Sequence, residues 1–209
     1  MPPHGPGMMG ATHSHDPQYP DDNWNLYAML DPSTTALNVT KPTDAIGIFK
    51  PFAHRLMPQP EIISDADAEI IIVARFTSPV HVRKIMVIGG AEESHHPSML
   101  RCYVNQDGVD FTSVGSLNPA QQFNLPINKE GLVELTTVLQ PFTNLMSLVF
   151  YFPANHGDEE TTVIKYIGMQ GEHTHYRREA VDAQYEVLCN GQDIEQPEGE
   201  LGAHAPHLH

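Results

Sequence analysis

The hydrophobic and polar positions of this chain fall into short blocks, and most of the blocks are typical of β-strands. Residues 68–76 form a nearly continuous apolar run rich in β-branched side chains, and residues 80–88 begin with alternating apolar and polar positions. Four further segments of this kind lie at residues 100–104, 131–139, 145–152 and 163–169. Turn-forming pairs such as Ser78-Pro79 separate the segments. The pattern predicts an all-β domain built as an antiparallel β-sandwich.

Two segments are compatible with short helices. Residues 24–30 carry apolar side chains at helical spacing, and Asp31-Pro32 would end that helix. Residues 176–187 have helix propensity but are mostly polar. No apolar run approaches the roughly 20 residues that a membrane-spanning helix requires.

The two ends of the chain differ from its middle. Residues 1–23 are rich in proline, glycine and histidine, and residues 190–209 are acidic and also contain histidine. Such segments bury too little apolar surface to offset the entropy of ordering them. We therefore expect one domain over residues 24–189 between two disordered tails. The first residues also lack the basic and apolar stretches of a secretory signal.

The charge of the chain is unevenly distributed. The 26 acidic and 11 basic residues give a net charge of −15, and every basic residue lies within residues 41–178. That interval also holds 15 acidic residues, so most of the excess negative charge belongs to the flanks. Because nucleic acids and anionic membranes require clustered basic side chains, the sequence argues against both as partners.

Thirteen histidines and two cysteines are the residues most suited to metal binding or catalysis. The close histidine pairs are His13/His15, His95/His96, His173/His175 and His207/His209. A structural zinc site needs about four converging ligands, and none of the pairs has further ligands at a suitable spacing. Cys102 and Cys189 form no C-x-x-C motif, and no nucleophile motif is present. We therefore predict no metal, no cofactor and no catalytic residues.

Two acidic segments are candidates for binding. Residues 64–69 place carboxylates at alternating positions, as in half of a calcium loop, but lack the turn glycine and the distal glutamate. We interpret them as a solvated turn before a strand. A second polar stretch precedes the strand predicted at residues 163–169, and its three consecutive carboxylates suit either an exposed loop or a surface for a basic partner. The candidate partner-binding residues are Asn155, His156, Gly157, Asp158, Glu159, Glu160, Thr161 and Thr162.

This second stretch and the strand after it resemble the signature of the PITH domain, the proteasome-interacting module found at the C-terminus of a thioredoxin-like protein. The matching residues are 157–162, 165–168 and 171–172, with further matches in the expected order at 61–67, 103–105 and 142–148. The resemblance covers residues 24–189. Residues 49–52 and 176–179, together with the lack of a C-x-x-C motif, resemble the stand-alone branch of the family.

The resemblance implies a β-sandwich of the galactose-binding-like jelly-roll type without catalytic residues. It also implies association with the 26S proteasome in the cytoplasm and nucleus. We therefore predict a non-enzymatic protein-interaction module that docks on a large assembly through residues 155–162. Three alternatives stay open: a structural or adaptor subunit of another complex, for example in the cytoskeleton or cilium; a regulator of transcription and differentiation; and a jelly roll that binds glycans or calcium.

Overall fold

The computed structural model describes residues 24–106 and 108–173, where eight β-strands are joined by loops and short 3-10 helices. In chain order the elements are η1 (Leu26–Met29), β1 (Thr35–Leu37), η2 (Pro42–Ile48), η3 (Phe52–His54), β2 (Ile62–Ile63), β3 (Ile70–Gly89), η4 (Glu93–His95), β4 (Met99–Val104), β5 (Gln121–Asn124), β6 (Leu135–Thr136), β7 (Leu145–Phe152) and β8 (Val163–His173). All strand pairs are antiparallel.

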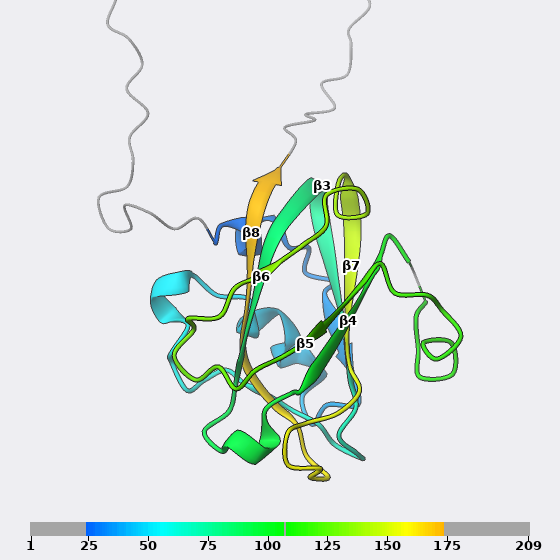
Figure 1. Cartoon of the computed structure of the whole chain (residues 1–209). Helices are drawn as coiled ribbons and strands as arrows, with labels where there is room; N and C mark the ends of the chain where they lie inside the picture. Colours follow the sequence, from blue (N-terminus) through cyan, green and yellow to red (C-terminus); the bar gives the residue numbers. More distant parts are fainter. Residues whose placement is uncertain (1–23, 107, 174–209) are drawn as a thin grey trace, which may run out of the picture. The chain divides into compact units, whose positions relative to one another are not determined.

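Strand β3 runs through both layers of the sandwich. Its first part, up to Arg75, pairs with β1 and β7, and its second part, from Val80, pairs with β8 and β6. The register with β7 shifts between these two residues, and Figure 1 shows the two arms of β3 diverging from a shared corner. Pro79 lies in this interruption, where its missing N–H costs no ladder hydrogen bond. The chain reverses direction at this corner, because β7 and β8 run in opposite directions and each is antiparallel to its own arm of β3. The strands predicted at residues 68–76 and 80–88 therefore correspond to the two arms, which the structure joins as one continuous strand.

The bend in β3 divides the hydrogen-bonded strands into two layers. The continuous order is β2-β8-β3-β7-β4-β5, with β1 and β6 also attached to β3. One layer therefore contains β2, β8, β6 and the second arm of β3, and the other contains β1, β7, β4, β5 and the first arm. Side chains from both arms, such as Ile72 and Ile85, belong to a single core together with Phe150 and Ile167. The predicted all-β sandwich is confirmed.

Both outer faces of the sandwich are also partly covered. Val109 and Val114, from the segment after β4, cover Ile71 and Tyr151 on one layer. Trp24 and Phe52 cover Met86, Ile88 and Tyr166 on the other layer. Because the first arm of β3 is buried on both faces, its sequence is a continuous apolar run and does not alternate.

The remaining expectations have mixed outcomes. Helix η1 confirms a short helix within residues 24–30, and β4, β7 and β8 confirm their predicted segments. The strand predicted at residues 131–139 shrinks to the two residues of β6, and β1, β2 and β5 were not predicted. Residues 176–187 and both predicted tails lie outside the described residues. No helix in the part of the chain described is long and apolar enough to cross a membrane.

Candidate functional site

All eight candidate residues lie on the loop that joins β7 to β8, at one end of the sandwich (Figure 1). The structure divides them into two groups. Asn155 and Thr162 are buried, whereas Asp158, Glu159 and Glu160 are exposed. We call the buried residues Asn155 and Thr162 the frame of the loop, and the exposed residues Asp158, Glu159 and Glu160 its acidic tip. Only the tip presents charged side chains to a partner.

Asn155 holds the loop closed from within. Its Nδ2 donates hydrogen bonds to the carbonyl oxygens of Glu159 at 2.8 Å and Thr161 at 3.1 Å. Its Oδ1 accepts from the backbone N–H of Glu159 at 2.8 Å. A buried amide with both ends satisfied gives a loop one conformation. The structure thus makes Asn155 a positioning residue that a partner does not reach.

Thr162 ties the end of the loop to the acidic turn at residues 64–69. Its Oγ1 donates to the carbonyl oxygen of Ala68 at 2.7 Å, and its backbone N–H donates to Oγ of Ser64 at 2.9 Å. The N–H of Ser64 returns a bond to the Thr162 carbonyl at 3.0 Å. Neither Ser64 nor Ala68 was singled out as a site residue, although both belong to the turn that the sequence did single out.

His156 and Gly157 connect the loop to η4. The Gly157 N–H donates to the carbonyl oxygen of Ser94 at 2.8 Å, and the His156 N–H donates to that of His96 at 2.9 Å. A Cβ at position 157 would lie 2.4 Å from Cβ of Ser94, so only glycine allows this approach. The Nε2 of His156 also bonds to the carbonyl oxygen of Leu125 at 2.8 Å. Three loops are therefore fastened together beneath the acidic tip.

The acidic tip consists of Asp158, Glu159 and Glu160. Asp158 has a backbone φ of 54°, in the left-handed region that aspartate and asparagine tolerate better than most residues. None of the three carboxylates forms an ion pair within the described ranges 24–106 and 108–173. The tip therefore offers three uncompensated negative charges on a backbone that the frame holds in place.

The acidic turn at residues 64–69 is occupied by its own hydrogen bonds. Oδ1 of Asp67 accepts from Nδ2 of Asn38 at 2.7 Å and from the backbone N–H of Glu69 at 2.9 Å. Within the residues that the structure places, no group of three or more histidine, cysteine, aspartate or glutamate side chains could hold a metal ion. Asp65 and Asp67 are exposed, in agreement with a solvated turn.

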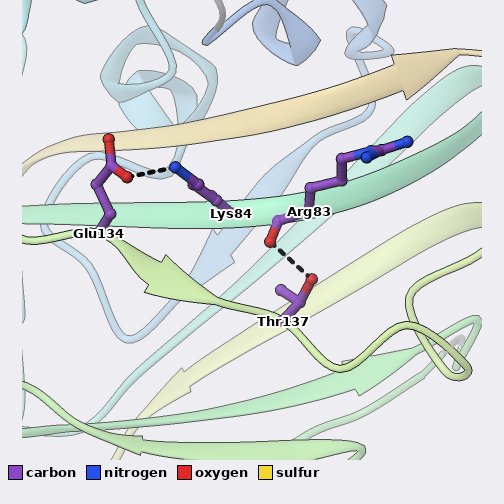
Figure 2. A network of polar contacts seen from close by, with 4 residues as sticks. All are labelled: Arg83, Lys84, Glu134 and Thr137. Carbon is purple, nitrogen blue, oxygen red and sulfur yellow. Dashed lines mark hydrogen bonds and ion pairs between the residues drawn. The ribbon is translucent and has the colours of Figure 1, made fainter.

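The basic side chains of the second β3 arm are paired with acidic ones. Lys84 Nζ lies 2.6 Å from Oε2 of Glu134, and Arg83 Nη2 lies 2.7 Å from Oε1 of Glu172. Figure 2 shows the Lys84–Glu134 pair and the bond from Oγ1 of Thr137 to the Arg83 carbonyl at 3.0 Å. These contacts hold β6 and the residue after it against β3. They also neutralise the two adjacent cations, which therefore do not form a basic patch.

Among the described residues, the buried candidates Cys102 and His96 are held in the interior of the domain. Cys102 is fully buried, and burial raises the pKa of its thiol, so the reactive thiolate is disfavoured. His96 is buried with Nε2 2.9 Å from the Gly90 carbonyl oxygen, whereas its neighbour His95 is half-buried. His173 ends β8, and His13, His15, His175, His207, His209 and Cys189 lie outside the described residues.

The only tryptophan of the chain is unavailable as a platform for a sugar ring. Trp24 is 6% exposed, and its ring stacks on that of Phe52 with a centroid distance of 6.1 Å. The stack covers the outer face of the layer that contains β8. Trp24 therefore gives no support to the glycan alternative that the jelly-roll resemblance left open.

Comparison with known proteins places this geometry in a family. The model of the PITH domain matches residues 16–188. PITH domain-containing protein 1 of Dictyostelium discoideum is 32% identical over 186 residues, which cover 88% of this chain and 90% of that protein. PITH domain-containing protein 1 of Homo sapiens is 31% identical over 194 residues, which cover 91% of this chain and 90% of that protein. The predicted boundaries at residues 24 and 189 stay predictions.

Solved structures support the fold alone. The CBM32-3 domain from a family 31 glycoside hydrolase of Clostridium perfringens has a TM-score of 0.51 and 11% identity, covering 70% of this chain and 93% of that one. A structure of CBM32-1 and CBM32-2 from the same organism in complex with GalNAc has a TM-score of 0.50 and 15% identity, covering 76% of this chain and 40% of that one. The predicted galactose-binding-like jelly-roll fold is confirmed.

Proposed function

The chain belongs to the PITH domain family, and from this premise we propose that it is a non-enzymatic protein-interaction module that docks on a large assembly. The observation that carries the proposal is the division of the β7–β8 loop into a buried frame and an exposed acidic tip. Buried polar groups cost free energy unless they are fully paired. A loop that pairs them and leaves three carboxylates uncompensated is suited to binding a complementary basic surface.

We further propose that the assembly is the 26S proteasome, met in the cytoplasm and nucleus. The support is the resemblance of residues 157–172 to the proteasome-interacting signature together with the placement of that signature's acidic residues at the tip. The glycines and hydroxyls of the signature frame the loop, so the carboxylates are left as its recognition groups.

The test reverses the charge of the tip while keeping its backbone. The variant combines Asp158→Asn with Glu159→Lys and Glu160→Lys, because asparagine also tolerates the left-handed conformation at position 158. Native lysate is passed over the immobilised full chain, and bound proteasome subunits are quantified by mass spectrometry. We expect enrichment by the natural chain and at least about a tenfold loss with the variant, since close charge pairs contribute more than 1.4 kcal/mol to binding.

A charge-matched control separates the tip from overall charge. Glu195→Gln, Glu198→Lys and Glu200→Lys together change the net charge by the same amount in the C-terminal segment. This control variant should retain full enrichment. Enrichment of a different assembly through the same tip would keep the interaction module and reject the proteasome. An equal loss in both variants, or no assembly enriched by the natural chain, would reject the tip itself.

A further inference from the structure

Two large apolar side chains are exposed on the segment between β5 and β6. Ile127 is 41% exposed and Leu132 is 73% exposed, and we call these two residues the apolar pair. Both side chains line one open hollow of about 280 Å³, which they share with Asn128, Lys129, Glu130 and Val133. Exposed apolar side chains that line a common hollow are typical of a surface that another molecule covers.

Asn128 holds the apolar pair in a fixed position. It is buried, and its Nδ2 donates to the carbonyl oxygen of Val87 on β3 at 2.9 Å. Its Oδ1 accepts from the backbone N–H of Leu132 at 3.0 Å and of Val133 at 3.4 Å. Asn155 holds the β7–β8 loop in the same way, with both ends of a buried amide satisfied. Because both segments are already ordered, a partner that binds them loses little entropy in fixing their backbones.

The segment of the apolar pair is fastened to the loop of the acidic tip. His156, in the loop of the tip, bonds through Nε2 to the carbonyl oxygen of Leu125 at 2.8 Å. Helix η4 contacts both segments, because it accepts the N–H of Gly157 and its Glu93 pairs with Lys129 at 3.2 Å. The apolar pair and the acidic tip therefore lie on neighbouring segments, with an exposed ion pair beside them.

On the premise of the interaction function proposed above, we propose that the apolar pair and the acidic tip bind the same protein partner, whose surface presents basic side chains next to an apolar one. The basic side chains face the carboxylates of the tip, and the apolar side chain fills the hollow lined by Ile127 and Leu132. The exposed Glu93–Lys129 pair supplies the polar rim that surrounds the apolar part of a protein interface.

The size and charge of the surface favour this partner. Pockets for small molecules have volumes of roughly 300–1,000 Å³, so the hollow is better suited to one protruding side chain. Three uncompensated carboxylates select a basic surface and speed its approach, but exposed charges are screened by salt. Contact with the apolar pair adds affinity that salt does not screen in this way.

Cross-linking tests whether one partner contacts both groups. The photoreactive analogue p-benzoylphenylalanine replaces Leu132 or Glu160, one position at a time, in the full chain, which is irradiated in native lysate. We expect both positions to attach to the same protein, at two sites in one domain. Apolar residues should surround the first site, and lysine or arginine the second. The control position is Leu139, which is 66% exposed and lies before β7, whereas the acidic tip follows it.

The outcomes separate this surface from the function proposed above. A partner attached at position 160 but not at position 132 would overturn the shared surface and keep the interaction function of the tip. Attachment of position 132 to another part of the chain, to a second copy or to a different protein would also overturn it. If neither position attaches to a partner, both proposals are wrong.

Salt dependence tests the two contributions without a modified residue. Ile127→Ser with Leu132→Ser should reduce enrichment of the cross-linked partner at least about tenfold, equally at about 50 mM and 300 mM salt. The loss caused by the charge-reversed tip should shrink as salt rises. Leu139→Ser is the control and should retain full enrichment. Unchanged enrichment in the double variant, or a loss that shrinks with salt, would contradict the proposal. Urea unfolding verifies that the double variant is folded, and Leu132→Gln alone replaces it if it is not.

Discussion

At the scale of single residues, Asn155 determines the shape of the β7–β8 loop. Replacing it by alanine leaves the Glu159 N–H and the Thr161 carbonyl without their buried partner. Asn155→Ala should therefore lower the free energy of unfolding by about 1–3 kcal/mol. Urea unfolding measures the change. Glu160→Ala, an exposed change on the same loop, should stay within about 0.5 kcal/mol, and similar values for the two variants would contradict the frame.

His96 should make the stability of the domain depend on pH. Burial lowers the pKa of His96 below the ordinary 6.5, Lys129 and His156 lower it further, and the Gly90 carbonyl and Glu93 oppose the shift. The unfolded chain therefore binds the proton more readily than the folded one. The contribution of His96 to the free energy of unfolding is fully present above pH 6.5, and it is lost as the pH decreases from there through the lowered folded-state pKa. Urea midpoints measured from about pH 8 to pH 5 should show this decline, and His96→Leu should flatten it. An unchanged slope in that variant would assign the decline to other groups.

At the scale of loops and strands, Gly157 sets how closely the β7–β8 loop approaches η4. A methyl group at this position would overlap Ser94, so the two loops must separate. Gly157→Ala should lower the free energy of unfolding by about 1–3 kcal/mol and speed hydrogen exchange in residues 94–96. Gly115→Ala is the control, because a Cβ there meets no atom within 4 Å. Equal effects of the two substitutions would show that the close approach is unimportant.

The strands show which parts of the fold a sequence pattern can reveal. Strands β4, β7 and β8 have strong apolar signals, and they were predicted close to their observed bounds. Strand β5 has the sequence Gln-Gln-Phe-Asn, and it exists because Cys102 and its neighbours in β4 supply hydrogen bonds across the pair. The continuity of β3 through Pro79 likewise depends on partners distant in the chain. Local pattern cannot report such long-range pairing.

The candidate site shows the same division between local and long-range information. The sequence located the polar loop and its three carboxylates, because eight polar residues before a strand form a local signal. It did not separate the frame from the tip, since that depends on contacts such as Thr162 with Ala68, which are 94 positions apart. The same limit applies to Lys50, whose buried position shows only once the loop around it is folded.

At the scale of the whole molecule, the charge distribution favours electrostatic association through the acidic end. Lys84 and Lys129 are each paired with a glutamate, so neither neutralises the tip. Exposed pairs of this kind contribute little to stability, about 0–1 kcal/mol each. Within the described residues, Asp158, Glu159 and Glu160 therefore keep their negative charges uncompensated at the tip of the β7–β8 loop.

Binding through the tip should therefore depend on ionic strength, whereas folding should not. Raising the salt concentration from about 50 mM to 300 mM shortens the screening length and should slow association with the captured assembly several-fold. Surface plasmon resonance with the purified assembly measures the rates. The variant Asp158→Asn/Glu159→Lys/Glu160→Lys should associate slowly at every salt concentration, yet unfold within about 0.5 kcal/mol of the natural chain, because the tip lies outside the core. Association that is insensitive to salt, or a variant that loses both binding and stability, would mean that the loop acts through its frame and not through its charge.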